Sequence, residues 1–358
     1  MPTERKRAVR TAAAWGADQT AMEALYGVGG YYTSLSLWEA GEQGDLVTLD
    51  EIHTAVCYND WSGNGLEEAA GFTIDGSTTD ATRYLKITVA EGHRHNGTLG
   101  SGFRVFRFDN AVFTIRDDNV LIEWVEARST EDGNGLNYAF DVSGEVTLFA
   151  CLGVSSYAAF FLRSGALANT VRAICCIASK DSRSNPLDYA FLSPSFGYST
   201  AELLNCVGYS NNSTPVFQGY HSAGVRHETV KNCIAIIGGT GAAFAGFDTT
   251  NSANNAATNG ASVTPPGANP YTSNVTSADF VDFANANYHL VSGSGLRGAG
   301  ANLYSAFTKD IDGDAWPNSG AWDIGADYYA VAGTLTINSI LASNITQTGA
   351  RITLGLTR

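Results

Sequence analysis

The chain has 358 residues, of which 44% are hydrophobic, 16% are charged and 39 are glycine, and its formal net charge is −14. This composition excludes a coiled coil, a helical bundle and a collagen-like chain, and the apolar content argues against disorder. The acidic balance argues against general nucleic-acid binding, because phosphate contacts need a basic face. No run of apolar residues approaches the roughly 18 that a membrane span needs, so no membrane-spanning segment is expected.

Residues 1–44 are expected to form an N-terminal arm and a cap. The first residues are basic but lack the apolar stretch of a secretion signal, so we expect an arm that is solvated or docked on a partner. Residues 31–40 read as the cap of a solenoid, whose open end would otherwise expose unpaired strand edges. Ser34 or Ser36 would N-cap a short helix there, and Leu37 and Trp38 would cover the first coil.

The middle of the chain repeats in two registers. Four short apolar segments carry a cysteine at the same place, at intervals of 25 to 30 residues: Cys151, Cys176, Cys206 and Cys233. A second series places a phenylalanine after a small apolar residue: Phe140, Phe160, Phe191, Phe217 and Phe244. Two landmarks with nearly the same period predict a solenoid, and the units are too short for a helix pair.

The predicted solenoid is a parallel β-helix, an all-β fold. Each strand would pair with its counterpart one coil later, so that equivalent side chains stack about 4.8 Å apart, with cysteine and phenylalanine facing inward. Residues 52–57, 84–89 and 112–115 read as strands of less regular early coils. At roughly 27 residues per coil, residues 45–290 would hold about nine coils.

The six cysteines fit neither a zinc spacing nor a compact disulfide framework. We expect them to be reduced and buried, in a protein made in a cytoplasm. Cys175 and Cys176 are adjacent, so they would face opposite ways, with one buried and the other in a different environment. Asn205 and Asn232 precede stacked cysteines and read as turn residues, with an Asn ladder as the alternative.

Several polar groups are candidates for chemistry, and a structural role is favoured for each. His93 and His95 would share one face of a strand, but no third metal ligand is near, and the Asn-Gly that follows predicts a turn. The pair Asp117-Asp118 also reads as a turn. The longest loop between the two registers carries groups that would serve a polysaccharide-cleaving enzyme, although a solvated loop is favoured: Asp181, Arg183 and Asp188.

Tyrosines and a group of aspartates complete the candidates. Four tyrosines in loops are candidates for stacking on sugar rings or for burial against a partner: Tyr157, Tyr189, Tyr198 and Tyr220. Asp310, Asp312 and Asp314 resemble a calcium loop but lack the glutamate at its twelfth position. Asp323 or Asp327 would have to complete the oxygen shell, so a hydrogen-bonded turn is favoured. No cofactor is expected, with calcium as the alternative.

Six short motifs near the C-terminus form a set: residues 279–282, 288–290, 293–294, 298–300, 310–314 and 322–327. They resemble the closing segment of right-handed parallel β-helix proteins of the pectate-lyase-like superfamily, of the kind encoded by tailed bacteriophages and environmental bacteria. Residues 29–40 resemble the front of the same group, so the resemblance covers about residues 28–328. It implies a right-handed coil closed by a C-terminal cap at residues 291–330, and it says little about activity.

The tail, residues 331–358, alternates like two strands and resembles the opening strands of a fibronectin-type or immunoglobulin-like sandwich. A lone hairpin is marginal in water, so this β-hairpin is expected to dock on the rod or on a neighbouring subunit.

The function expected first is that of a non-catalytic virion structural protein of a tailed phage, such as a capsid-decorating, spike or fibre component. Its partners would be other virion proteins or copies of itself, a homotrimer among them, and cell-surface polysaccharide; no nucleic acid and no membrane are expected. Such a protein assembles in the host cytoplasm. The alternatives are an extracellular polysaccharide lyase or glycoside hydrolase and, third, a bacterial surface adhesin.

Overall fold

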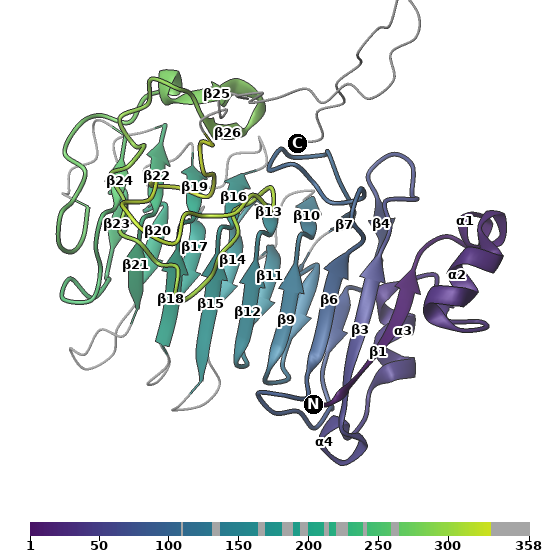
Figure 1. Ribbon diagram of the computed structural model, residues 1–358. Coiled ribbons are helices and arrows are strands. Elements are labelled where there is room, and N and C mark those ends of the chain that lie inside the picture. The colour runs from purple at the N-terminus through teal and green to yellow at the C-terminus, as the bar shows by residue number, and fades with distance from the viewer. Residues whose placement is uncertain are drawn as a thin grey trace, which may run out of the picture.

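The computed structural model describes residues 1–108, 110–130, 137–163, 169–180, 189–193, 200–210, 215–219, 228–238, 242–258 and 265–330. Within them the chain winds into a right-handed parallel β-helix, in which every strand of three long sheets runs parallel to its neighbours (Figure 1). This arrangement confirms the fold class predicted from the repeats.

Three sheets form the walls of the coil. Sheet 1 contains, in spatial order, β2 (Tyr31–Tyr32), β1 (Thr3–Val9), β3 (Glu51–Cys57), β6 (Leu85–Val89), β9 (Val120–Glu123), β12 (Val146–Phe149), β15 (Thr170–Ile174), β18 (Thr200–Leu204) and β21 (Thr229–Lys231). Sheet 2 contains β4 (Leu66–Glu67), β7 (Arg104–Phe108), β10 (Glu126–Thr130), β13 (Leu152–Ser155), β16 (Ile177–Lys180), β19 (Val207–Ser210), β22 (Ile234–Ile237) and β24 (Ala256–Ala257). Sheet 3 contains β5 (Phe72–Ile74), β8 (Phe113–Ile115), β11 (Tyr138–Val142), β14 (Ala158–Leu162), β17 (Tyr189–Ser193), β20 (Phe217–Gly219) and β23 (Phe244–Ala245).

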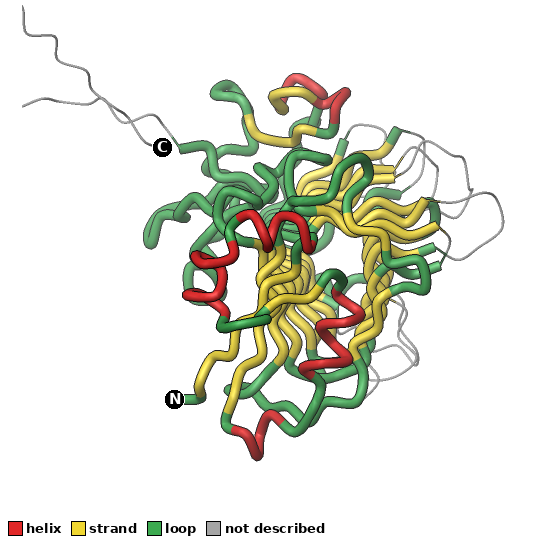
Figure 2. The backbone as a smooth tube through the Cα atoms, turned by 90° about the vertical axis from the view of Figure 1, so that its right-hand side faces the viewer, coloured by secondary structure: helices red, strands yellow, loops and turns green. Residues whose placement is uncertain are grey.

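Seven consecutive coils of the described chain each give one strand to all three sheets. Strands β1 and β24 add one further layer at either end, so the stack agrees with the expected number of about nine. Seen from the N-terminal end, the strands of successive coils lie behind one another (Figure 2).

Inward side chains form the two predicted columns. The phenylalanine column runs through every coil, with neighbouring ring centroids 4.7 to 5.3 Å apart: Phe72, Phe113, Phe140, Phe160, Phe191, Phe217 and Phe244. The four repeated cysteines are fully buried and unoxidised. Each thiol donates to a carbonyl of the preceding coil, for example Cys206 Sγ to Ala173 O at 3.2 Å. Because like residues recur at each coil, one sequence pattern fills the whole interior.

From β9 onward, the corner between sheets 1 and 2 is a single left-handed residue in each described coil. Its φ is between 50° and 56° at Trp124, Ala150, Cys175, Asn205, Asn232 and Asn254. Asparagine tolerates this conformation better than most residues. Asn232 Nδ2 also donates to Asn205 Oδ1 at 2.9 Å, so the two asparagines are turn residues and a ladder at once.

The N-terminal residues belong to the coil rather than to a solvated arm. Strand β1 pairs with β3 over its whole length, and β2 pairs with the end of β1. Between and after them lie α1 (Ala12–Ala17), α2 (Gln19–Tyr26), α3 (Leu35–Glu42) and α4 (Leu46–Leu49). No described helix has the length and apolarity needed to cross a bilayer.

The cap helix α3 confirms part of the expectation. Ser34 is its N-cap and accepts from the Leu37 N–H at 3.1 Å, and Trp38 is fully buried against the first coil. The expectation was wrong for Leu37, whose side chain is 54% exposed. Leu37 lies two positions from the buried Leu35, which places the two on opposite sides of a helix.

Residues 283–330, here called the C-terminal segment, lie along the flank of the coil over the corner between sheets 1 and 2 (Figure 1). Before it come η1 (Ser277–Asp279) and β25 (Phe280–Asp282), and it begins with η2 (Phe283–Asn285) and β26 (Asn287–Leu290). One hydrogen bond that holds it to the coil is donated by Asn205 Nδ2 to Gly325 O at 2.7 Å. It covers a stacked row of outward apolar side chains that are at most 2% exposed: Leu152, Ile177, Val207 and Ile234.

The adjacent cysteines illustrate the two sides of this wall. Cys176 faces inward in the cysteine column, and Cys175 faces outward, as predicted from strand alternation. Cys175 is nevertheless fully buried, because the C-terminal segment covers it and its Sγ lies 3.6 Å from Lys309 O. The two thiols therefore have different environments although both are buried.

Candidate functional site

A groove crosses the outer face of sheet 1 at its N-terminal end. Its volume is 590 Å³, and its floor consists of outward side chains of β1, β3 and β6. Register places Lys6, Thr54 and Lys86 side by side on the three strands, and Val56 beside Thr88 in the next row. The groove therefore follows from the pairing of β1 with β3, because alternation sends each of these side chains outward.

Two pairs of charged groups in the groove form ion pairs. Lys86 Nζ lies 2.9 Å from Glu123 Oε2, and Lys6 Nζ lies 3.1 Å from Glu4 Oε2. Thr54 Oγ1 donates to Glu4 Oε1 at 2.9 Å. Burial raises the pKa of Glu4, but the hydrogen bonds from Lys6 and Thr54 outweigh it and hold the pKa below its usual value. Glu4 is thus an ionised acceptor at neutral pH.

Thr88 of β6 contributes a hydroxyl to the groove. The Thr88 hydroxyl is buried and makes no hydrogen bond among the described residues. A buried hydroxyl without a partner is unfavourable by about 1–3 kcal/mol, so a ligand that reaches it would recover part of that free energy.

Aromatic rings border one side of the groove. The Tyr26 and Tyr58 hydroxyls are 2.8 Å apart, and burial raises the pKa of Tyr26. The Arg10 guanidinium lies over the Tyr58 ring at 4.5 Å, and His93 meets the same ring edge-on with centroids 4.9 Å apart. Polar pairs, a free hydroxyl and aromatic edges can together bind a polyhydroxylated ligand.

The predicted histidine pair is not assembled as a metal site. His93 Nδ1 accepts from the Asn59 N–H at 3.1 Å. His95 is buried: its Nε2 donates to Ala150 O at 2.8 Å, and its Nδ1 accepts from the Gly97 N–H at 3.2 Å. Burial lowers the pKa of His95 to about 4, so the ring is neutral. Residues 93–95 follow the end of β6 and are not part of a strand, so the expectation that the two rings share one strand face was wrong.

The candidate residues of the loops are only partly described. Tyr157 directly precedes β14, whereas Tyr189 is the first residue of β17 and not a loop residue as expected. Their rings form an edge-on column with Tyr138 at centroid distances of 5.6 and 5.9 Å. This column lies on a different wall from the groove, so the structure does not bring the two together. Five further candidates lie outside the described residues: Asp181, Arg183, Asp188, Tyr198 and Tyr220.

The predicted aspartates form a turn rather than one ligand cluster. Asp310 is fully buried, and its Oδ1 accepts from the N–H groups of Asp312 and Asp314 at 3.0 and 2.8 Å. Its Oδ2 accepts from the Tyr328 N–H at 3.1 Å. Burial and the charge of Asp312 raise the pKa of Asp310 to about 8, against the opposing effect of the backbone donors. The calcium alternative stays a prediction.

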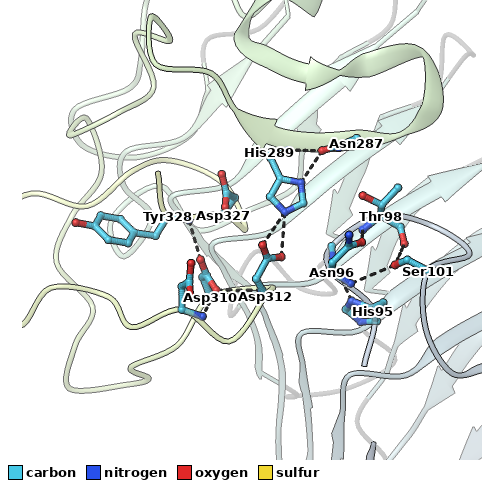
Figure 3. Close-up of polar contacts among 12 residues, drawn as sticks. His95, Asn96, Thr98, Ser101, Asn287, His289, Asp310, Asp312, Asp327 and Tyr328 are labelled. Carbon is cyan, nitrogen blue, oxygen red and sulfur yellow. Dashed lines mark hydrogen bonds and ion pairs between the residues drawn. The ribbon is translucent and has the colours of Figure 1, made fainter. Parts of the chain in front are cut away.

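Asp312 instead meets a histidine that sequence reasoning missed (Figure 3). His289 Nε2 lies 2.9 and 3.0 Å from the two carboxylate oxygens of Asp312, and His289 Nδ1 lies 2.5 Å from Asn287 Oδ1. Asp327 completes the cluster and accepts from the Leu290 N–H at 2.8 Å. Burial lowers the pKa of His289, but Asp312 outweighs it and raises the pKa overall. Burial also raises the pKa of Asp327, to about 6.

Comparison with known proteins gives a fold neighbour and no family. No family model matches the chain, and no curated protein matches it. Among solved structures, the chain is similar to a crystal structure of pectate lyase Pel9A, with a TM-score of 0.46 and 15% identity over 91% of this chain and 96% of that one. The fold assignment here depends on the parallel strand pairing of this chain itself.

Proposed function

We propose that this β-helix is a non-catalytic glycan-binding protein, with the groove over β1, β3 and β6 as its binding site. The observation that carries the proposal is the composition of that groove: two ion pairs, an unpartnered Thr88 hydroxyl and tyrosine edges along one floor. Sugars offer a dense set of donors and acceptors and an apolar ring face. Paired charges can hydrogen-bond the sugar hydroxyls, and aromatic edges can contact the apolar ring face. Because these charges are paired, the groove does not favour a charged ligand over a neutral one.

As the setting we propose the virion of a tailed phage, where the protein would be a capsid-decorating, spike or fibre component. The resemblance of residues 28–328 to phage-encoded β-helix chains supports this setting. Two apolar side chains near the groove also fit a protein partner: Leu25 is 64% exposed and Val28 is 89% exposed. Large exposed apolar side chains mark contact surfaces more often when they occur together.

Binding is tested with Lys86→Met and Thr88→Val against a panel of bacterial surface polysaccharides, by affinity electrophoresis and glycan arrays. We expect a wild-type signal that falls at least tenfold in either variant. Arg172→Met is the matched control, because Arg172 occupies the same outward row of sheet 1 outside this groove. Wild-type binding that neither groove variant weakens, or no binding to any polysaccharide, would overturn the glycan site. A mass-spectrometric inventory of purified phage particles tests the setting.

A polysaccharide-cleaving enzyme is the second candidate, favoured by one feature of the same groove. Glu4, Glu91 and Glu123 share it with Lys6 and Lys86, so acids and amines stand together where a sugar chain would lie. Lyases and hydrolases use such groups for proton transfer. Release of oligosaccharides by the wild type that is lost in Glu123→Gln, and retained in Arg172→Met, would favour the enzyme over the binding protein.

A further inference from the structure

We propose that His289, Asp312 and Asp327 form a binding site for one divalent metal ion of the zinc class, which locks the C-terminal segment in place. The three ligand atoms, one imidazole nitrogen and two carboxylate oxygens, all lie within 4.8 Å of one another. The residues come from three separate stretches of the C-terminal segment: β26, the turn at residues 310–314, and residues 322–327. This site does not depend on the proposed glycan groove.

The donor set selects the metal class. Imidazole with carboxylate suits zinc and its neighbours among the first-row metals, whereas calcium prefers six to eight oxygen ligands. Ligand atoms around a tetrahedral zinc, at bond lengths of about 2.0–2.2 Å, stand about 3.3 Å apart. His289 Nε2 and Asp312 are already closer than that, at 2.9 Å, so side-chain rotation must open this pair and bring Asp327 in.

The surroundings prepare His289 as a ligand through Nε2. Asn287 Oδ1 faces Nδ1 at 2.5 Å, so Nδ1 carries a proton and Nε2 is the nitrogen turned to the acids. Metal-bound histidines generally hold their second nitrogen in this way. The metal would replace the proton that Nε2 shares with Asp312 in the metal-free protein, and this proton would pass to solvent water.

A glycine of the coil lies directly beside the His289–Asp312 pair. Gly97, in the loop after β6, has φ +73°, and a Cβ there would lie 2.8 and 2.9 Å from His289 Cε1 and Nε2 and 3.0 Å from Asp312 Oδ1. Only glycine therefore lets this loop lie so close to the two side chains. His289 and Asp312 keep side-chain exposures of 18% and 29%, so an ion can enter from solvent. Three protein ligands and one solvent position make a complete tetrahedral set.

The alternative without a metal is an ion pair between His289 and Asp312, in which Asp327 only accepts a hydrogen bond from the Leu290 N–H. The two readings predict different ligands. An ion pair needs no Asp327, whereas a metal site loses a ligand when Asp327 is changed. Binding by the exposed acidic turn alone would depend on Asp314 as much as on His289.

The test uses the full chain after treatment with a chelator, titrated with zinc chloride by calorimetry. We expect one zinc per chain, an affinity that falls about 100-fold in His289→Gln and Asp327→Asn, and an unchanged affinity in Asp314→Asn, which removes a charge from the same turn. Zinc should also slow the labelling of Cys175 in the wild type, because the metal holds the segment that covers this thiol. No saturable binding at millimolar zinc, or equal binding by all three variants, would overturn the site.

A second measurement needs no variant and so does not depend on their folding. Cobalt added to the metal-free wild type should give the visible absorption of a four- or five-coordinate ion with nitrogen and oxygen ligands, and zinc should abolish it by displacement. X-ray absorption at the zinc edge should show a single imidazole. A spectrum with oxygen ligands only would contradict the assignment.

Discussion

The coil and the C-terminal segment are held in place by different means. In the coil, each inward side chain contacts its equivalent one turn away, as in the phenylalanine and cysteine columns. In the C-terminal segment, carboxylates and amides bind backbone groups far away in the chain, as Asp310 binds the Tyr328 N–H and Asn205 binds Gly325 O. The first kind of contact repeats and spreads over many residues, whereas the second occurs once and depends on single side chains.

This difference predicts how each region fails. Apolar burial in the stack is shared by neighbouring coils, so the stack should open as one unit. The segment also buries apolar side chains against the coil, such as Trp322 and Ile324, but its buried hydrogen bonds occur once each and their loss leaves unpaired donors. It should therefore open before the stack does.

Phe160→Ala should have the largest effect. Phe160 is fully buried between Phe140 and Phe191 in the column, with centroids 5.1 and 4.7 Å away. The cavity should lower the free energy of unfolding of the coil by about 3–5 kcal/mol. Urea unfolding followed by circular dichroism measures it. Phe161→Ala, on the outward face of the same strand, is the control and should lose much less; equal losses would contradict the inward stack.

Asp310→Ala should open the C-terminal segment while the coil stays folded. The change leaves three backbone N–H groups without their acceptor, a loss of about 2–3 kcal/mol for the segment. Labelling by a thiol reagent measures it, because Cys175 lies under the segment and the column cysteines lie inside the coil. Mass spectrometry should find one rapidly labelled cysteine, Cys175. Simultaneous labelling of the column would show that the two regions open together.

Asn205→Ala should weaken the junction of the two regions by about 2 kcal/mol. It removes the hydrogen bonds to the backbone of the segment and places alanine in a left-handed conformation, at φ 52°. Asn205→Gly loses the same hydrogen bonds, but glycine adopts the left-handed conformation without strain. It should therefore destabilise the junction by about 1 kcal/mol less than Asn205→Ala does. Cys175 labelling rates of the two variants measure both contributions; identical rates would exclude the conformational one.

The pH dependence of the metal-free protein should have opposite signs in the two regions. The pKa values of Asp310 and Asp327 are raised to about 8 and about 6, so the segment binds protons more tightly when it is folded. Their contribution is complete below the ordinary carboxyl pKa of about 3.9 and is lost as the pH rises through 6 and 8. The raised pKa of His289 acts in the same direction. Between about pH 5 and 8 the free energy of opening the segment should therefore fall as the pH rises.

His95, on the coil side, behaves in the opposite way. Its pKa is lowered to about 4 by burial, so its contribution is present above the ordinary histidine value of about 6.5 and is lost as the pH falls through 4. Hydrogen exchange of segment and coil peptides across this pH range checks both signs. Segment protection that rises with pH would contradict the assignment.

Much of the coil was predictable because repetition makes it visible in one sequence. Cys176, Cys206 and the phenylalanines recur at nearly the same interval, and strand alternation then decides which side they face. Leu37 was placed wrongly because a short cap helix has no repeat to fix its orientation, and only the Ser34 cap determines which face is buried.

The candidate sites were harder to predict for a physical reason. Lys86 and Thr88 look like ordinary outward strand residues until β1 is known to lie beside β3. His289 gives no local signal, because its partners follow it by 23 and 38 residues along the chain. The sequence grouped Asp312 with Asp310 and Asp314, its neighbours along the chain. In the folded protein its partners are His289 and Asp327, which are distant in sequence. The signal that was available was the conjunction of one histidine with several aspartates in the closing motifs.

The most direct test of the two-part account is native-state hydrogen exchange of the full chain at increasing denaturant, followed peptide by peptide. Amides of β12, β15 and β18 should share one high free energy of opening, and residues 283–330 should open together at a distinctly lower one. A single opening free energy for both regions would contradict the account, as would a coil that exchanges before the segment lying on it.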